Sequence, residues 1–164
     1  MNYFNPFSSP FWLTIGVAVL CGTIIGLERQ LRGKPAGVRT SCLICLGTAV
    51  FIHLGSGVAS SSSDPTRVLG QLVTGIGFLG AGVILAREGT VSGVTTAAVI
   101  WVLAAIGAAI GLGHLLGAIA LSAVTVGILT GMESLESAIK LLRRGVHSHE
   151  RGSKNGDPGL GSRE

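Results

Sequence analysis

The stretch Val94–Gly113 reads VTTAAVIWVLAAIGAAIGLG and contains no charged side chain. A helix of about 20 residues is about 30 Å long, which matches the hydrocarbon core of a bilayer. The apolar run is continuous and does not alternate with polar residues, which argues against a strand of a membrane barrel. A helix also pairs every backbone N–H and C=O within one segment, as lipid requires. The stretch therefore predicts a transmembrane helix.

Four further apolar runs lie on either side of this stretch, at residues 11–27, 40–58, 68–86 and 114–130. Only 12% of the 164 residues are charged, about half the share of a soluble domain. The charges fall into four groups, at 28–39, 64–67, 87–88 and 133–164. We predict an all-α fold, a polytopic transmembrane bundle of about five glycine-rich helices. The junction of Gly113 and His114 leaves room only for a tight turn between the last two.

The distribution of Lys and Arg predicts the orientation. The loop between the first two runs carries four cations, and the segment after the fifth run carries six. With five spans both segments lie on the same side, and basic segments favour the cytoplasm. The N-terminus is then outside and the C-terminus cytoplasmic, and the loop with Asp64 faces the outside.

The same pattern divides the chain into four parts. Residues 1–10 form a short extracytoplasmic N-terminus that has no Lys or Arg, so the first run is expected to be a retained helix. Residues 11–131 form the transmembrane domain. Residues 132–144 have an apolar face and continue the fifth helix as an amphipathic cytoplasmic helix. Residues 145–164 are rich in Gly, Ser and charge, which predicts a disordered tail.

Small residues at helical spacing predict close helix packing in lipid. Gly22 and Gly26 are four residues apart, and so are Gly107 and Gly111. The expected packing set is Gly75, Gly77, Gly80, Gly82, Gly107, Gly111 and Trp101. The four glycines between residues 75 and 82 also make a weak helix, and transporters place weak helices at ion sites.

Several polar residues at the ends of the runs are candidates for function. Glu28 and Arg32 are four apart and are expected to pair on one helical turn. Asp64 precedes Pro65 as a helix cap would, but Asp64, Arg67 and Gln71 also share one face, and Gln71 is expected to face the bundle interior. Glu28 and Asp64 are the candidate metal ligands. Thr95 and Thr96 are expected to bond to their own helix backbone.

Other classes of function find no support in the residues. The cations flank apolar runs, which excludes a nucleic-acid surface. There is no phosphate-binding loop, zinc-protease motif or nucleophile elbow, so we predict that the protein is not an enzyme. No cofactor is expected, apart from Mg²⁺ if the protein transports it. The three cysteines lie in apolar runs and are expected to pack there.

Three blocks of sequence resemble the MgtC/SapB family. Glu28-Arg29-Gln30 with Pro35-Ala36-Gly37-Val38-Arg39-Thr40 resembles its first signature. Asp64-Pro65-Thr66-Arg67, Gln71 and the segment Gly75–Gly82 resemble the second. The segment Gly93–Ala98, with Trp101, Gly107 and Gly111, resembles the third. The resemblance marks as functional the residues Glu28, Arg29, Gln30, Arg39, Thr40, Asp64, Arg67 and Gln71.

This resemblance implies a multi-pass protein of the bacterial inner membrane, linked to growth in low magnesium and to virulence. It implies a regulator that contacts a membrane complex such as ATP synthase. Many members add an ACT-like cytoplasmic domain, which the residues after the fifth run do not match. The expected partners are the lipid bilayer and either another membrane protein or further copies of the chain. The alternative is an oligomeric transporter or channel for Mg²⁺ or another cation.

Overall fold

The computed structural model describes residues 6–58, 66–87 and 90–152 and divides into two compact units, Met1–Val126 and Gly127–Glu164. Its elements are α1 (Ser9–Leu31), α2 (Val38–Val58), α3 (Thr66–Gly82), β1 (Leu85–Arg87), β2 (Thr90–Ser92), α4 (Val94–Gly111) and α5 (Leu115–Gly152). The all-α helical membrane fold is confirmed, with a single two-stranded hairpin added to it within the described residues.

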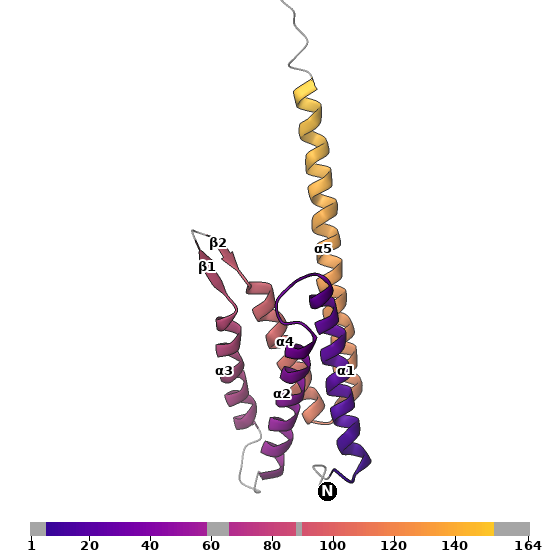
Figure 1. Ribbon diagram of the computed structural model, residues 1–164, viewed down its shortest axis with the longest axis vertical. Coiled ribbons are helices and arrows are strands. Elements are labelled where there is room, and N and C mark those ends of the chain that lie inside the picture. Colours follow the sequence, from indigo (N-terminus) through magenta and orange to yellow (C-terminus); the bar gives the residue numbers. More distant parts are fainter. Residues whose placement is uncertain (1–5, 59–65, 88–89, 153–164) are drawn as a thin grey trace, which may run out of the picture. The chain divides into compact units, whose positions relative to one another are not determined.

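The helices of the first unit run in alternating directions, so successive connections lie at opposite ends of the bundle (Figure 1). We call the end with the Arg32–Gly37 loop and the β1–β2 hairpin the basic end. The opposite end holds residues Pro6–Ser8 and the turn between α4 and α5 (Figure 1). That turn is as tight as expected, because Gly113 adopts a φ of +87° that side chains disfavour.

Four described helices are long and apolar enough to span a membrane: α1, α2, α4 and the first part of α5. Helix α3 has 17 residues and ends at Gly82, whereas we predicted a helical span to residue 86. Glycines weaken the helix there, and the β-branched Val83 and Ile84 favour extended backbone. The chain therefore leaves α3 early and enters β1.

The hairpin pairs β1 with β2 in antiparallel register, with Leu85 opposite Ser92 and Arg87 opposite Thr90. Gly93 then starts α4 with a φ of +90°. A Cβ at Gly93 would overlap the Val83 carbonyl oxygen, so this position requires glycine both for its backbone angle and for space.

Helix α2 packs between α1 and α4, and all three helices contribute well-buried apolar side chains. They include Cys21 and Ile25 of α1, Cys45 and Ile52 of α2, and Leu103, Ile106 and Ile110 of α4. The Cys45 thiol donates to the Leu103 carbonyl at 3.4 Å, which links α2 to α4. All three cysteines are free, and Cys21 and Cys45 are buried, in agreement with the predicted packing role.

Two glycine pairs let α2 approach its neighbours closely, as their spacing predicted. A Cβ at Gly22 would stand 2.6 Å from the Cα of Cys42, and one at Gly26 would stand 2.5 Å from the Cα of Val38. On the other side, Gly107 and Gly111 face carbonyl oxygens of α2, which would lie only 2.6 and 2.7 Å from a Cβ at these positions. Backbone therefore contacts backbone on both sides of α2.

Of the four α3 glycines predicted to pack, one contacts another described helix. Gly80 lies against the Trp101 ring and Ala97 of α4, at 3.6–3.7 Å from a Cβ position, and Trp101 is 45% exposed. A Cβ at Gly75, Gly77 or Gly82 would meet no described atom within 4 Å. The reason is that α3 contacts α4 mainly through one side of the helix, and these three glycines lie on its other sides.

Helix α5 begins at Leu115, and its part within the first unit buries Ala118, Ser122 and Thr125. These small residues recur at helical spacing, and the Ser122 hydroxyl donates to the Ala118 carbonyl at 2.9 Å, which satisfies it within the helix.

In the second unit the helix continues to Gly152. Residues 145–152, which we assigned to the disordered tail, are therefore helical, because extending a formed helix costs little compared with starting one. Residues 153–164 lie outside the described part of the chain.

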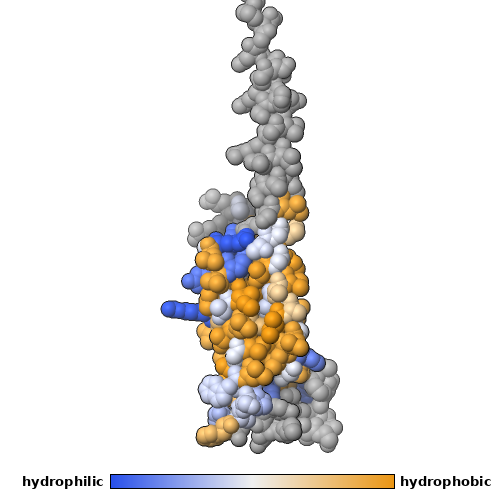
Figure 2. Space-filling model, turned by 90° about the vertical axis from the view of Figure 1, so that its right-hand side faces the viewer, coloured by the Kyte–Doolittle hydropathy of each residue, from blue (hydrophilic) through white to orange (hydrophobic). Residues whose placement is uncertain are grey.

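The surface of the first unit matches a lipid environment. Figure 2 shows a broad hydrophobic band over the helices, bounded by hydrophilic residues. Large apolar side chains are exposed on every helix of the unit, for example Leu13, Leu43, Phe78, Trp101 and Leu116. A large contiguous apolar surface of this kind marks contact with lipid or with another protein.

Candidate functional site

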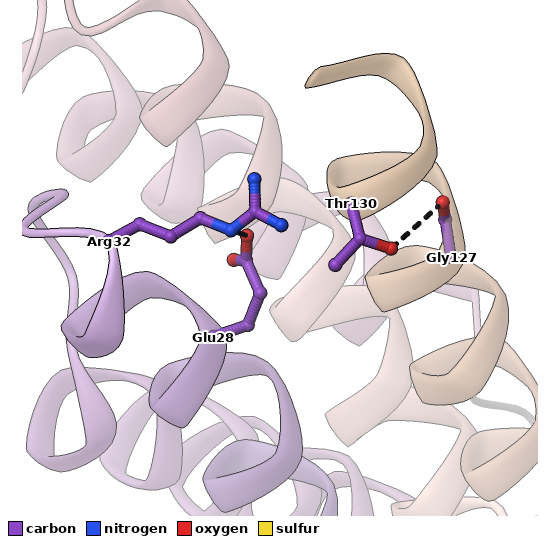
Figure 3. A network of polar contacts seen from close by, with 4 residues as sticks. All are labelled: Glu28, Arg32, Gly127 and Thr130. Atoms are coloured by element: carbon purple, nitrogen blue, oxygen red, sulfur yellow. Dashed lines mark hydrogen bonds and ion pairs between the residues drawn. The ribbon is translucent and has the colours of Figure 1, made fainter. Parts of the chain in front are cut away.

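A charged cluster lies at the basic end, where α1 ends. Glu28 and Arg29 are only 8% and 4% exposed. Arg32 lies one turn beyond Glu28, and its Nε is 2.8 Å from Glu28 Oε1 (Figure 3). This is the i, i+4 pair that the sequence predicted. It compensates the charge of a carboxylate that would be costly to bury alone.

Arg29 crosses to a different helix. Its Nη2 donates to the hydroxyl of Thr96 at 3.0 Å, in the first turn of α4. The two residues are 67 positions apart, so the sequence spacing gave no sign of this contact. We expected Thr96 to bond to its own helix, and the structure assigns it to Arg29. A buried cation thus joins α1 to α4.

The cluster leaves two buried polar atoms without a hydrogen-bond partner among the described residues. These are Glu28 Oε2 and Arg29 Nε. An unsatisfied buried group costs about 1–3 kcal/mol, so the cluster is held in place by the packing around it. The Glu28 carboxylate already forms an ion pair with Arg32. The described residues also contain no group of three His, Cys, Asp or Glu placed to hold a metal ion.

The loop after α1 is built around the same cluster. The Lys34 amide donates to the Arg29 carbonyl at 2.9 Å, and the fully buried Ser41 hydroxyl donates to the Ala36 carbonyl at 3.1 Å. Gly33 and Ala36 both have positive φ, near +60°. Gln30 is exposed and lies beside Gly37, where a Cβ would stand 3.3 Å from Gln30 Oε1. The bonds place the exposed Lys34 and Arg39 at the surface of the basic end.

The second set of predicted residues lies elsewhere. Arg67 is exposed in the first turn of α3, and α3 begins at the end of the bundle opposite to the basic end (Figure 1). Asp64 lies outside the described residues. We predicted that Gln71 faces the bundle interior. Gln71 is instead exposed and lines a groove between α2 and α3. The structure therefore does not unite the predicted residues in one site.

This groove has a volume of about 600 Å³. Helices α2 and α3 make little contact with each other, because α3 packs mainly on α4. This arrangement leaves an open space between α2 and α3. One wall is formed by Thr40, Leu43, Gly47 and Phe51 of α2, and the other by Val68, Gln71, Gly75 and Leu79 of α3. Sequence reasoning did not find the groove, because it depends on which side of α3 meets α4.

These features define a multi-pass helical membrane protein with a buried charged cluster at one end of its bundle. Residues 15–138 match the MgtC family, and the chain belongs to that family.

Two relatives have descriptive names. The chain is 52% identical over 103 residues to the "Putative magnesium transporter YhiD" of Escherichia coli K12, covering 58% of this chain and 47% of that protein. It is 46% identical over 111 residues to Protein MgtC of Salmonella typhimurium LT2, covering 68% and 47%.

A third relative, from Haemophilus influenzae, is an uncharacterized protein that is 42% identical over 125 residues, covering 71% of this chain and 52% of its own length. The chain thus spans about half the length of the curated relatives it matches. No solved structure matches it.

Proposed function

We propose that this chain is a regulatory protein of the bacterial inner membrane, which serves adaptation to low magnesium by binding a transmembrane helix of another membrane protein. The observation that supports this most is a face of α3 that the described residues leave uncovered. Gly70, Thr74, Gly77 and Ala81 follow one another at spacings of four and three, and so form a stripe along one side of the helix. We call it the α3 stripe.

The α3 stripe contrasts with the other small-residue faces of the chain. The backbone of α2 occupies the space beside Gly22 and Gly26 of α1 and beside Gly107 and Gly111 of α4. A Cβ at Gly70 or Gly77 would meet no described atom within 4 Å, and Thr74 and Ala81 are exposed. Small residues in lipid favour close contact with another helix. A face of this kind that no described residue of its own chain covers suits a helix of another protein.

The charged cluster supports a role in contact over one in transport. Among the residues of α1–α4, the sole carboxylate is Glu28, and it is bound to Arg32. Mg²⁺ keeps most of its water and binds through one or two free carboxylates. A buried carboxylate that already pairs with Arg32 is a poor ligand for a divalent cation.

Replacing Gly77 with leucine is expected to abolish binding of the partner helix while the protein stays folded, because the new side chain projects from the α3 stripe into open space. A photo-reactive residue at Thr74 reports the contact in membranes, and the ATP synthase is the first complex to look for among the products. The matched control is Gly16→Leu, since Gly16 also has no described atom within 4 Å but lies on α1. Equal crosslinking in wild type and Gly77→Leu would refute the proposal.

A second candidate function, transport of Mg²⁺, rests on the name of the YhiD relative. Purified protein in liposomes with an internal Mg²⁺ indicator distinguishes the two. Under the regulatory proposal, the influx equals that of empty liposomes. A specific influx that Asp64→Asn removes would instead establish transport and overturn the regulatory proposal.

A further inference from the structure

We propose that the groove between α2 and α3 holds an acyl chain of an anionic phospholipid, whose headgroup lies at the basic end near Arg39 and Thr40. The proposal does not depend on the partner contact proposed above, because the α3 stripe and the groove lie on different sides of α3. Gly75 and Leu79 line the groove, whereas Gly77 and Ala81 do not.

The shape of the groove fits a chain that enters from one end. Its α2 wall runs from Thr40 to Phe51, which in a helix is about 17 Å. This is close to the depth of one leaflet, which is about half of the 30 Å hydrocarbon core. Gly47 and Gly75 face the groove from opposite walls, and a Cβ at either would meet no described atom within 4 Å. The middle of the groove is therefore open to a thin apolar chain.

The far end of the groove is closed. The Val68 side chain of α3 packs against Gly55 of α2, where a Cβ would stand 2.7 Å from Val68 Cγ2. A transmembrane helix is about 10 Å wide and would have to pass this contact to lie along the groove. An acyl chain ends within one leaflet and does not need to pass it. The geometry thus favours lipid over a helix as the occupant.

The open end of the groove is basic. Arg39 and Lys34 are exposed there, and Thr40 lines the groove itself. The sequence contains no acidic residue between Glu28 and Asp64, and Glu28 is buried and paired with Arg32. Exposed cations at a membrane surface attract anionic headgroups, which are abundant in the cytoplasmic leaflet. Under the predicted orientation the basic end faces that leaflet, so charge and shape select the same ligand.

The polar lining is consistent with this arrangement. Thr40 lies at the headgroup level. Gln71 lies in the far half, five residues after the start of α3 at Thr66, which is about 7.5 Å along the helix. Its amide therefore lies towards the closed end of the groove, near Val68 and beside the far part of the acyl chain.

Native mass spectrometry of the full-length protein in detergent tests the proposal. Delipidated protein is titrated with phosphatidylglycerol or phosphatidylcholine. Wild type is expected to retain one phosphatidylglycerol, with an affinity about tenfold above that for phosphatidylcholine, as one well-placed charge contact supplies. Gly47→Leu fills the groove and is expected to lose both lipids, whereas Gly16→Leu on α1 retains them. Arg39→Gln is expected to lose the preference for phosphatidylglycerol, and Arg39→Lys to keep it.

A phosphatidylglycerol with a photo-reactive group in its acyl chain locates the site. Crosslinks are expected in the peptides that carry residues 43–51 and 68–79, and Gly47→Leu removes them. Retention of lipid by Gly47→Leu, or equal affinity for both headgroups in wild type, would overturn the proposal. So would a change in the oligomeric mass of Gly47→Leu without any change in bound lipid, since the groove would then hold a second copy of the chain.

Discussion

Replacing Gly26 with leucine is expected to prevent α1 from packing on α2, with the largest loss of folded protein among the substitutions proposed. Even the Cβ of alanine would stand 2.5 Å from the Cα of Val38 and 2.8 Å from its amide nitrogen. Carbon atoms in contact prefer about 3.5–4.0 Å, so α1 would have to move by about 1 Å. Both neighbours are backbone atoms, so no side chain can rotate out of the way.

Overpacking of one or two methyl groups costs about 1–3 kcal/mol, and leucine exceeds that range. The measurement is the fraction of monodisperse protein after extraction, followed by unfolding in SDS. Gly26→Ala should be intermediate, and Gly16→Leu should behave as wild type because a Cβ at Gly16 meets no described atom within 4 Å. A Gly26→Leu protein as stable as the Gly16→Leu control would show that α1 and α2 are not in backbone contact.

Replacing Glu28 with alanine is expected to destabilise the protein by about 3 kcal/mol, the cost of leaving a buried ionic group without its partner. Arg29 is 4% exposed and donates to Thr96, while Arg32 is held by Glu28 itself. Without the carboxylate, the charges of Arg29 and Arg32 repel each other, and Arg29 loses the nearby negative charge of Glu28.

Thr96→Val provides the comparison, because it removes only the acceptor of the 3.0 Å bond and keeps the shape of the side chain. Its expected cost is about 1–3 kcal/mol. Unfolding in SDS gives both values, and the Glu28→Ala and Thr96→Val double mutant tests whether they add. Strict additivity, or a neutral Glu28→Ala, would mean that Glu28 and Arg29 do not act as one cluster.

The helices were predictable because lipid imposes a simple rule on the sequence. A long run without charge, such as Val94–Gly113, must satisfy its backbone internally, and that requirement alone predicts α4. The pairing of Glu28 with Arg32 was predictable for a similar reason, since both lie on one helix and their distance follows from its pitch. The glycine pairs of α1 and α4 were predictable as packing faces, but the sequence did not say that both pack on α2.

The other features of the fold and of the candidate site depend on contacts between helices. Arg29 bonds Thr96 because the start of α4 lies beside the end of α1, and no local pattern encodes that neighbour. Gly80 packs on Trp101 whereas Gly77 does not, although both are glycines of one helix, because only one side of α3 meets α4. That same choice of side turns Gln71 into the α2–α3 groove instead of the bundle interior. The sequence by itself determined which segments are apolar enough to enter a membrane, through hydropathy and charge. The tertiary structure alone decided which of their faces remain open to lipid or to a partner, because that depends on how the helices are rotated against one another.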